Sequence, residues 1–400
     1  MDDLIVQKYS VMGNERDKNE TLIELKEAYS QVETDWISQR IDHFKQTDKR
    51  EYYQRFMYNM EFYNDSGLAF LLIGGEGKIS KSWIGYPRFP LLIWAKKYGA
   101  ACFLLEHRFF GKSQPFNNIS VESYKYLTID QVLADTKSFI IEANEIFFPN
   151  ITKPRWILFG SSYSGALATW FRATNENLTT AAIVSSGVVQ AKVDQYYYLK
   201  NVEDKLEKEN PKCPEAVRLG MEEIIGKIYT LDGRKELAKA FKACEAFPEP
   251  PTSKIARRSW LWLSCTQIGF MSTTNYGKSI FGSSVPLDFY IDQCMDIFGD
   301  KYDAEQVHNG VHKTLRKYGG NLYYNGTRTV FVNGSNDPWK TACFLNLNDT
   351  MREVYSVMVE GGSHCTDTHA VDRSDSQSLR NVRAFVKTKL EMFIRNLYNH

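Results

Sequence analysis

The chain has 400 residues, of which 43% are hydrophobic and 14% aromatic. This length exceeds that of an ordinary single core, so we expect a core with a second lobe. The 49 basic and 48 acidic residues leave a formal net charge of +1, which gives no electrostatic reason to expect a nucleic-acid partner. No apolar stretch approaches the roughly eighteen residues that cross a bilayer, so no membrane span is predicted.

The compartment is indicated by two opposing features. Residues 1–35 are charged and lack the apolar segment of a signal peptide. Eight Asn-x-Ser/Thr sequons argue the other way, because chance would give about three. We therefore expect a glycosylated protein of the secretory pathway, lysosomal or extracellular, whose signal peptide is missing from this start. The sequons lie at Asn19, Asn64, Asn118, Asn150, Asn177, Asn325, Asn333 and Asn348, and Asn333 is expected to stay unmodified.

Strand-like runs alternate with helical patterns through most of the chain. Such alternation predicts an α/β fold, with a mostly parallel sheet covered by helices. The expected strands are Leu68–Ile73, Ala101–Leu105, Trp156–Phe159, Ala181–Ser185, Thr329–Val332 and Ser356–Val359. The expected helices around them are Ile129–Asn144, Ala166–Thr174 and Ser378–Tyr398.

The first expected strand runs into a glycine-rich turn, Gly74-Gly-Glu-Gly77. Backbone amides of such a turn can point at the negative oxygen that forms during acyl transfer. We therefore take Gly75 and Glu76, together with the N–H of Tyr163, as candidates for an oxyanion hole. After the second strand, the charged cluster Glu106-His107-Arg108 is expected to brace the site.

The third strand ends in the most informative motif of the chain, Gly160-Ser-Ser-Tyr-Ser-Gly165. An apolar strand that breaks at a glycine, presents a serine and passes at once into a helix is typical of a nucleophile elbow. Ser162 is therefore the candidate nucleophile. The usual pattern is G-x-S-x-G, whereas here Ser164 takes the fifth place and Gly165 follows one position late. A serine-rich turn without a catalytic role is the alternative.

Between about Asp194 and Tyr324 the strand pattern stops. Stretches rich in Lys, Glu and Ala predict helices there, interrupted by Phe247-Pro-Glu-Pro-Pro251. These helices are expected at Asn201–Asn210, Glu215–Tyr229 and Arg234–Ala246. The expected organisation is an N-terminal extension (1–35), the first part of a core (36–193), a helical cap (194–324) and the second part of the core (325–400).

Two further residues follow the serine in the chain order Ser, Asp, His. Asp337 comes after the strand Thr329–Val332, where a carboxylate can orient an imidazole; a local Asx-turn is its alternative role. His364 lies on a glycine-rich loop after Ser356–Val359 and can take the proton of the serine hydroxyl. His369 is the main alternative base.

Five ordered motifs resemble the prolyl carboxypeptidase family of serine peptidases, which includes lysosomal Pro-X carboxypeptidase, dipeptidyl peptidase II and thymus-specific serine protease. They are Ile73–Gly77, Leu105–Ser113, Gly160–Gly165, Asn333–Trp339 and Gly362–Cys365. The resemblance runs from about Gln39 to the C-terminal helix and is closest to the thymus-specific branch. It implies an α/β-hydrolase fold with an inserted helical cap.

The same resemblance implies a serine exopeptidase that cuts after proline or another small residue near a peptide terminus. Its triad would be Ser162, Asp337 and His364. Gln267 stands where the family usually carries Glu, and an amide cannot pair with an ammonium group as a carboxylate does. A carboxylesterase or lipase on the same fold and a catalytically inactive binding protein are the alternatives.

Other candidates for substrate binding come from residue type and place. Trp339, beside the acid, and Tyr323 can form an apolar slot for a prolyl ring, although ordinary packing is the commoner role of such residues. Glu76 can bind a free ammonium group. The expected partners are peptide substrates, and a homodimer is left open.

Seven cysteines are distributed in a way that suggests disulfides. We expect three bridges and one core thiol, with seven thiols as the alternative. Neither an HExxH motif nor a clustered Cys/His set occurs, so no metal and no cofactor are expected. The cap holds Cys213, Cys244, Cys265 and Cys294, while Cys343 and Cys365 flank the Asp and His loops and Cys102 lies in a strand.

Overall fold

A computed structural model describes residues 29–242 and 251–395. The chain forms two compact units. The second unit comprises Ala191–Lys317 and Asn336–Thr341, and the first comprises the described residues before Ala191, those from Tyr318–Ser335 and those from Ala342 onward. Each unit is treated by itself below, and the domain boundaries drawn from the sequence stay a prediction.

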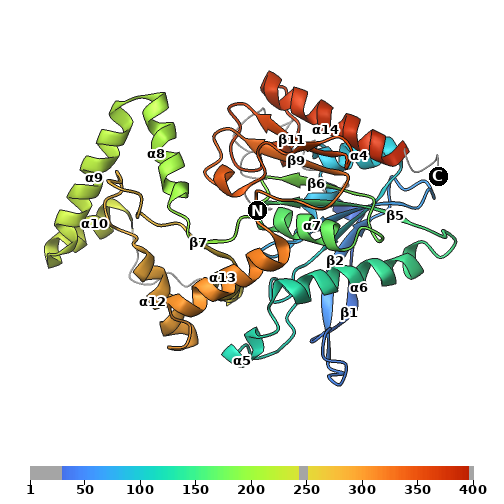
Figure 1. Ribbon diagram of the computed structural model, residues 1–400, viewed down its shortest axis with the longest axis horizontal. Coiled ribbons are helices and arrows are strands. Elements are labelled where there is room, and N and C mark those ends of the chain that lie inside the picture. The colour runs from blue at the N-terminus through green and yellow to red at the C-terminus, as the bar shows by residue number, and fades with distance from the viewer. Residues whose placement is uncertain (1–28, 243–250, 396–400) are drawn as a thin grey trace. The chain divides into compact units, whose positions relative to one another are not determined.

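A nine-stranded sheet forms the centre of the first unit, in the order β1-β2-β4-β3-β5-β6-β9-β11-β10 (Figure 1). The six strands from β4 to β11 are parallel. The edge strands β1 and β10, and β2 next to β1, are antiparallel to their neighbours. The strands are β1 (Val32–Arg40), β2 (Glu51–Asn59), β3 (Leu68–Ile73), β4 (Ala101–Leu105), β5 (Arg155–Ser161), β6 (Ala181–Ser185), β9 (Thr329–Gly334), β10 (Asn348–Asp349) and β11 (Val354–Val359).

The six parallel strands are the six expected from the sequence. They read as short apolar runs because helices cover both faces of the sheet; β4, for example, is Ala-Cys-Phe-Leu-Leu and is buried throughout. The sequence analysis missed β1, β2 and β10. The hairpin of β1 and β2 is an edge with exposed charged positions, so its apolar residues do not form an uninterrupted run.

Helices lie on both faces of this sheet (Figure 1). α7 packs on β5 and β6, and α6 packs against α7, while α4 and α14 contribute to the core on the opposite face. The helices of the first unit are α3 (Ser82–Gly85), α4 (Pro90–Tyr98), α5 (Val121–Tyr124), α6 (Ile129–Phe147), α7 (Ser162–Thr174) and α14 (Gln377–Arg395), with a short 3-10 helix, η3 (Thr366–Thr368). The three helices expected in this unit are therefore confirmed.

The second unit is mainly helical. Its helices are α8 (Tyr197–Glu209), α9 (Lys212–Ile228), α10 (Leu231–Ala240), α11 (Pro251–Leu263), α12 (Leu287–Phe298) and α13 (Ala304–Tyr318), with a π-helix, η1 (Ser264–Ile268). The expectation that strands stop after Asp194 is wrong, because β7 (Lys192–Asp194) pairs in parallel with β8 (Gly269–Met271). Each strand has three residues, too few for a sequence pattern. The expected helix end at Ala246 and the run from Phe247 lie largely outside the described residues.

The expectation of three disulfides is wrong. Among residues 29–242 and 251–395 the structure contains one bridge, Cys265–Cys294, which joins η1 to α12 within the second unit. Cys102 is a buried thiol in β4, as expected, and Cys213 and Cys365 are also thiols. Cys244 lies outside the described residues.

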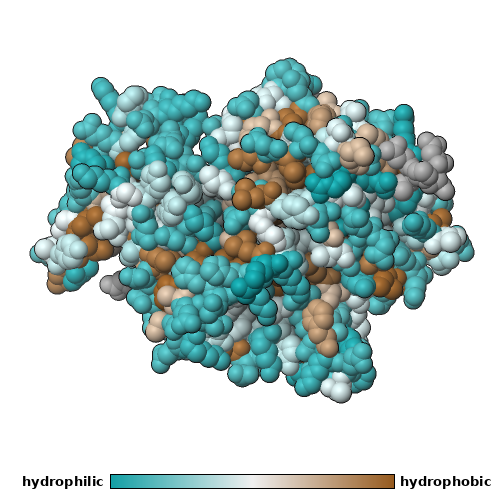
Figure 2. Space-filling model, in the orientation of Figure 1, coloured by the Kyte–Doolittle hydropathy of each residue, from teal (hydrophilic) through white to brown (hydrophobic). Residues whose placement is uncertain are grey.

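The surface carries mostly hydrophilic residues on the face that Figure 2 shows, with apolar residues in small separate groups. No helix within the described part of the chain is both long and apolar enough to span a bilayer. Among the sequon residues, Asn333 is buried in β9, where its side-chain amide donates to the carbonyl of Phe344 at 2.7 Å. This burial agrees with the expectation that Asn333 stays unmodified.

Candidate active site

Ser162 lies at the junction of β5 and α7, where the sequence predicted a nucleophile elbow. Its φ is +56°, in the left-handed region that a serine rarely adopts, whereas Ser161 before it is extended. A strained turn of this kind is held only when the surrounding structure fixes it. The backbone geometry is therefore that of an elbow, with Ser162 at its apex.

Two glycines allow the strand and the helix to approach each other at this turn. A Cβ on Gly160 would lie 2.3 Å from the carbonyl oxygen of Ser164, and a Cβ on Gly165 would lie 2.9 Å from the Cα of Gly187. The Ser164 hydroxyl accepts from the Ser161 N–H at 2.9 Å and donates to the Ser161 carbonyl at 2.8 Å. The Ser164 hydroxyl thus closes the turn through its two bonds to Ser161. The position where a Cβ would clash is Gly165, one residue later than the glycine of the usual pattern.

The glycine-rich turn after β3 lies beside the elbow. A Cβ on Gly75 would be 3.6 Å from the Cβ of Ser164, which is ordinary contact distance. The Gly74 N–H, at the start of the turn, donates to the Leu105 carbonyl at 2.8 Å, so the end of β4 anchors this end of the turn. Further on, the Ile79 N–H donates to the buried carboxylate of Glu106 at 3.2 Å. The structure therefore brings the candidate oxyanion turn next to Ser162 and holds it from both ends.

His107, the next residue of the charged cluster, reaches the elbow directly. Its Nδ1 lies 2.7 Å from the Arg108 carbonyl and its Nε2 lies 3.2 Å from the Tyr163 hydroxyl. Burial lowers the pKa of His107 to about 4, so the imidazole is neutral at physiological pH. A neutral ring whose Nδ1 donates to a carbonyl leaves Nε2 to accept the Tyr163 O–H. This bond ties the residue after Ser162 to the end of β4.

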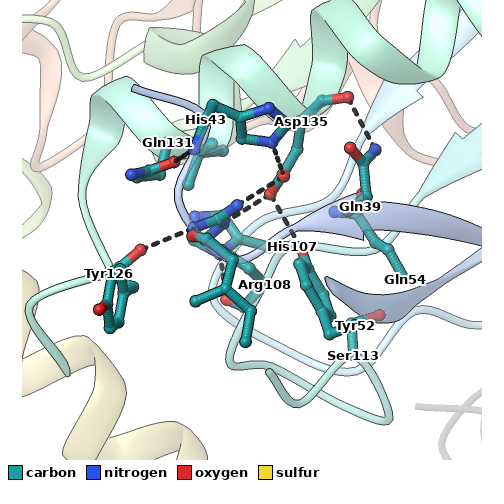
Figure 3. Close-up of polar contacts among 12 residues, drawn as sticks. Gln39, His43, Tyr52, Gln54, His107, Arg108, Ser113, Tyr126, Gln131 and Asp135 are labelled. Carbon is teal, nitrogen blue, oxygen red and sulfur yellow. Dashed lines mark hydrogen bonds and ion pairs between the residues drawn. The ribbon is translucent and has the colours of Figure 1, made fainter. Parts of the chain in front are cut away.

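Arg108, whose carbonyl bonds to His107, is itself held in a buried network (Figure 3). Its guanidinium donates to both carboxylate oxygens of Asp135, each at 2.6 Å, and to the carbonyls of Ile41 and Tyr126 at 3.0 and 2.8 Å. Burial acts to raise the pKa of Asp135, but the adjacent Arg108 holds it below its usual value. The expectation that this cluster braces the site agrees with these contacts.

A cavity of about 320 Å³ opens beside Ser162 within the first unit. Its walls are mainly apolar and include two stacked aromatic pairs, Trp83 with Phe89 and Trp94 with Phe159. Polar groups reach it from four places: the glycine-rich turn with Lys78, the elbow, the end of β6 and η3. The polar and charged lining side chains are Glu76, Lys78, Ser161, Ser162, Ser164, Ser185, Asp367 and Thr368.

Two carboxyl groups face this cavity. Glu76 is exposed and Asp367 is half-buried, and the protein around each removes part of the hydration of its carboxyl. This desolvation raises the pKa of Glu76, although its own backbone N–H and His364 act in the opposite sense. Desolvation also raises the pKa of Asp367, opposed by the hydrogen bond from the Ser185 hydroxyl.

His364 lies on a loop that the first unit anchors at several points. Cys365, next to it, has a φ of +56°, and its N–H donates to the Ser186 hydroxyl at 3.0 Å. His364 is half-buried and interacts electrostatically with both Glu76 and Asp367. The predicted base therefore belongs to the same neighbourhood as the cavity beside Ser162.

The strand that leads to Asp337 ends beside this histidine loop. A Cβ on Gly334 would lie 2.4 Å from the Gly362 carbonyl, and the Gly361 N–H donates to the Ser335 hydroxyl at 2.8 Å. Asp337 itself belongs to the second unit, where it is fully buried and accepts from the Trp339 N–H at 2.8 Å. This bond has the form of the Asx-turn named above as its alternative role.

The other predicted residues are not among those that line the cavity. Trp339 packs against Tyr198 and Phe270 in the second unit, and Gln267 is half-buried in η1 of that unit. Tyr323 is 70% exposed. His369, the alternative base, is exposed, and its carbonyl accepts from Arg383 at 2.6 Å. No cluster of three or more His, Cys, Asp or Glu able to hold a metal occurs within the described ranges.

Sequence reasoning missed Asp367 and the aromatic walls of the cavity. Asp367 follows His364 by three residues and lies just beyond the motif Gly362–Cys365 that contains the base. Its partner Ser185 ends β6, and the two are 182 positions apart. Trp83, Phe89 and Trp94 come from α3, α4 and the segment between them, for which no local sequence pattern indicates contact with Ser162.

A mostly parallel sheet with helices on both faces, and a serine at a strained turn between a central strand and a helix, define an α/β-hydrolase. The family described as Serine carboxypeptidase S28 matches residues 39–254 and 248–386, which together span most of the chain. The chain therefore belongs to this family of serine peptidases, and it is a serine peptidase.

Named relatives agree with this assignment. A Caenorhabditis elegans relative that carries a serine-protease name is 31% identical, over 93% of this chain and 86% of its own. The human thymus-specific serine protease is 25% identical, over 90% and 86%. The mouse lysosomal Pro-X carboxypeptidase is 22% identical, over 91% and 90%.

Solved structures similar to the chain include two hydrolases. A proline iminopeptidase of Mycobacterium smegmatis has a TM-score of 0.42 and 13% identity, covering 89% of this chain and 98% of its own. An esterase of Pyrobaculum calidifontis has a TM-score of 0.43 and 10% identity, covering 96% of each chain.

Proposed function

We propose that this serine peptidase is an exopeptidase that cuts after proline or another small residue near a peptide terminus, with Ser162, His364 and Asp337 as its triad. The observation that carries the proposal is the left-handed backbone of Ser162 at a cavity that the glycine-rich turn also lines. The name of one relative, a Pro-X carboxypeptidase, supports the substrate class.

In the proposed reaction Ser162 Oγ attacks the carbonyl carbon of the scissile bond while His364 takes the hydroxyl proton. His364 then gives this proton to the leaving amine, which departs as the C–N bond breaks. A water molecule, activated by the same imidazole, hydrolyses the acyl-enzyme and regenerates Ser162. Asp337 orients the imidazole and stabilises its charged form.

The negative oxygen of each tetrahedral intermediate needs two N–H donors. We assign one to Tyr163, which follows Ser162, and the other to Gly75 or Glu76 on the glycine-rich turn. The contact between this turn and Ser164 supports the assignment. Removing one such donor typically lowers kcat about a hundred- to a thousandfold, so the backbone of this turn should be sensitive to substitution.

We assign substrate recognition to four further residues. Trp339 and Tyr323 would contact a prolyl ring. Gln267 and Glu76 would bind the charged terminus of the substrate. The lysosomal relative and the sequons support a secretory route to a lysosomal or extracellular location. A homodimer remains part of the proposal.

The test is labelling with a fluorophosphonate probe, which reacts covalently with an activated serine. Wild type should be labelled and Ser162→Ala should not, while Ser161→Ala, one position earlier on the same turn, should keep labelling. Failure of folded, glycosylated wild type to label would overturn the nucleophile assignment. A panel of Xaa-Pro reporters then separates a dipeptidyl peptidase, which needs a free amine, from a carboxypeptidase, which needs a free carboxylate.

A carboxylesterase is the second candidate, and the aromatic walls of the cavity favour it because they suit an apolar acyl chain. The two carboxyls at the same cavity favour a peptide, whose ends and side chains can be charged. Matched ester and amide reporters decide between them. Turnover of the ester reporter without turnover of the amide reporter would show that the protein is an esterase.

A further inference from the structure

The cavity beside Ser162 is larger than a prolyl ring or a methyl side chain needs. Its aromatic pairs come from α3, α4, β5 and the segment between the two helices, while its carboxyls come from the glycine-rich turn and η3. A small side chain on the acylating residue would leave these groups without contact. The cavity therefore suits a longer side chain with an apolar stem and a polar end.

The polar part of the cavity is mainly acidic. Glu76 and Asp367 line it together with one cation, Lys78, which is exposed, and His364 is the imidazole near both carboxyls. Glu76 has no ion pair with any residue in 29–242 or 251–395. A partly desolvated carboxyl that interacts with His364 but forms no ion pair with a lysine or arginine gains from a cation that a ligand brings.

Asp367 is held in place by the fold and is not a mobile surface carboxyl. The Ser185 hydroxyl at the end of β6 donates to its Oδ1. Arg383 of α14 donates through Nε to the Asp367 carbonyl at 3.0 Å and through Nη2 to the His369 carbonyl at 2.6 Å. The Arg383 charge itself pairs with Asp375 at 2.6 Å. Asp367 thus brings its carboxyl to the cavity from a fixed backbone.

We propose that this cavity binds the side chain of a lysine or arginine residue whose carbonyl Ser162 attacks, with Asp367 and Glu76 as the carboxyls that recognise its cationic end. The inference rests on the proposed role of Ser162. It adds basic residues to the proline and small residues of the proposed function. Trp83, Phe89, Trp94 and Phe159 then line the aliphatic stem, and an indole or phenyl face also suits a guanidinium.

The first experiment compares arginine with citrulline at the residue before the scissile bond, because the two have nearly the same shape and differ in charge. Wild type should cleave the arginine reporter with a kcat/KM at least about tenfold higher. Asp367→Asn preserves the size of the side chain and its bond with Ser185, and it should bring the ratio to about one. Glu76→Gln should lower the ratio in part.

The matched control is Glu360→Gln, which removes an exposed carboxylate at the end of β11 that does not line the cavity. This variant should keep the wild-type ratio. An equal rate for arginine and citrulline in a wild type that labels at Ser162 and cleaves proline reporters would overturn the inference and leave the proposed function standing.

A binding measurement tests the cavity without catalysis. Calorimetry on Ser162→Ala should show N-acetyl-arginine amide binding at least about tenfold more tightly than N-acetyl-citrulline amide. Adding Asp367→Asn should remove the difference. Equal affinities would overturn the inference, whereas a clear preference for arginine in a protein that the fluorophosphonate never labels would support the cavity assignment and reject the nucleophile.

Discussion

The Nε2 atom of His107 lies 3.2 Å from the hydroxyl oxygen of Tyr163, the residue that follows Ser162. Both side chains are buried, and burial raises the pKa of Tyr163, so the phenol keeps its proton and donates it to His107. Tyr163 supplies a proposed oxyanion donor with its N–H. His107 is thus a positioning residue that acts on the elbow through this side chain.

We expect Tyr163→Phe to lower kcat about tenfold with little change in KM, because the lost bond loosens the donor without touching the substrate. His107→Phe should act in the same way. The double variant should be no worse than either single one, since both remove one interaction.

Tyr98→Phe is the control for this pair, because the Tyr98 hydroxyl bonds to α14 away from the elbow. Steady-state kinetics on the four variants check the prediction. Additive losses in the double variant would show that His107 and Tyr163 act independently.

Gly165→Ala should destabilise the first unit by about 1–3 kcal/mol, because its Cβ would meet the backbone of Gly187 at 2.9 Å. Gly220→Ala in α9 is the matched control. A Cβ there meets nothing within 4 Å, and alanine favours a helix, so a gain of up to about 1 kcal/mol is expected. Denaturant unfolding measures both, and a neutral Gly165→Ala would mean that the strand and helix can separate at the elbow.

Asp135→Asn should cost about 3–5 kcal/mol of folding stability at neutral pH, because it leaves the fully buried Arg108 guanidinium without its partner. Since the folded pKa of Asp135 is lowered, its contribution is present above the unfolded pKa, near 3.8, and is lost as pH falls through the folded value. Unfolding at several pH values should show this loss at acid pH. Glu122→Gln, at an exposed pair with Lys125, should change little.

Asp367→Asn should raise the melting temperature at pH 7. The folded pKa of Asp367 is raised above 3.8, so the protein loses stability as pH rises from the unfolded to the folded value. Asparagine does not titrate and avoids this loss of stability. The difference in stability between the variant and wild type should vanish near pH 3, where Asp367 is protonated in both the folded and the unfolded protein. Thermal unfolding of the two proteins across this pH range checks the sign, and a variant less stable at pH 7 would contradict it.

The preference for a basic substrate should follow the same titration. Below the raised pKa values the carboxyls of Glu76 and Asp367 are neutral, so the ratio of arginine to citrulline cleavage should be small at acid pH and rise with pH. Lys78, Tyr163, His364 and Arg383 are charged or titratable groups near them. A ratio that stays constant from pH 4 to pH 8 would contradict this prediction.

The sequence was sufficient to predict the strands that are buried on both faces. β3, β4 and β6 were predicted with their observed bounds, because uninterrupted apolar runs mark both ends of such strands. The hairpin of β1 and β2 was missed because long-range pairing and buried polar residues decide it. Gln54 and Arg55 of β2, for example, are buried against Glu106.

The elbow was predictable because its requirements are local. Gly160, Ser162 and Gly165 stand within six residues, and the strain, the close packing and the turn all arise there. The cavity beside it was not predictable, because its carboxyl Asp367 and its hydroxyl Ser185 meet only after the sheet has formed. The disulfide count failed for a related reason: clustering in sequence does not determine which thiols become neighbours.

Arg383 connects the last helix of the first unit to the loop of the proposed base. Its three hydrogen bonds end on Asp367, His369 and Asp375, and α14 follows every other described element in the sequence. During synthesis on the ribosome, Ser162 therefore emerges more than 200 residues before the guanidinium that fixes this loop. A growing chain carries the serine for most of its translation without a completed site, which delays hydrolytic activity until the fold is nearly finished.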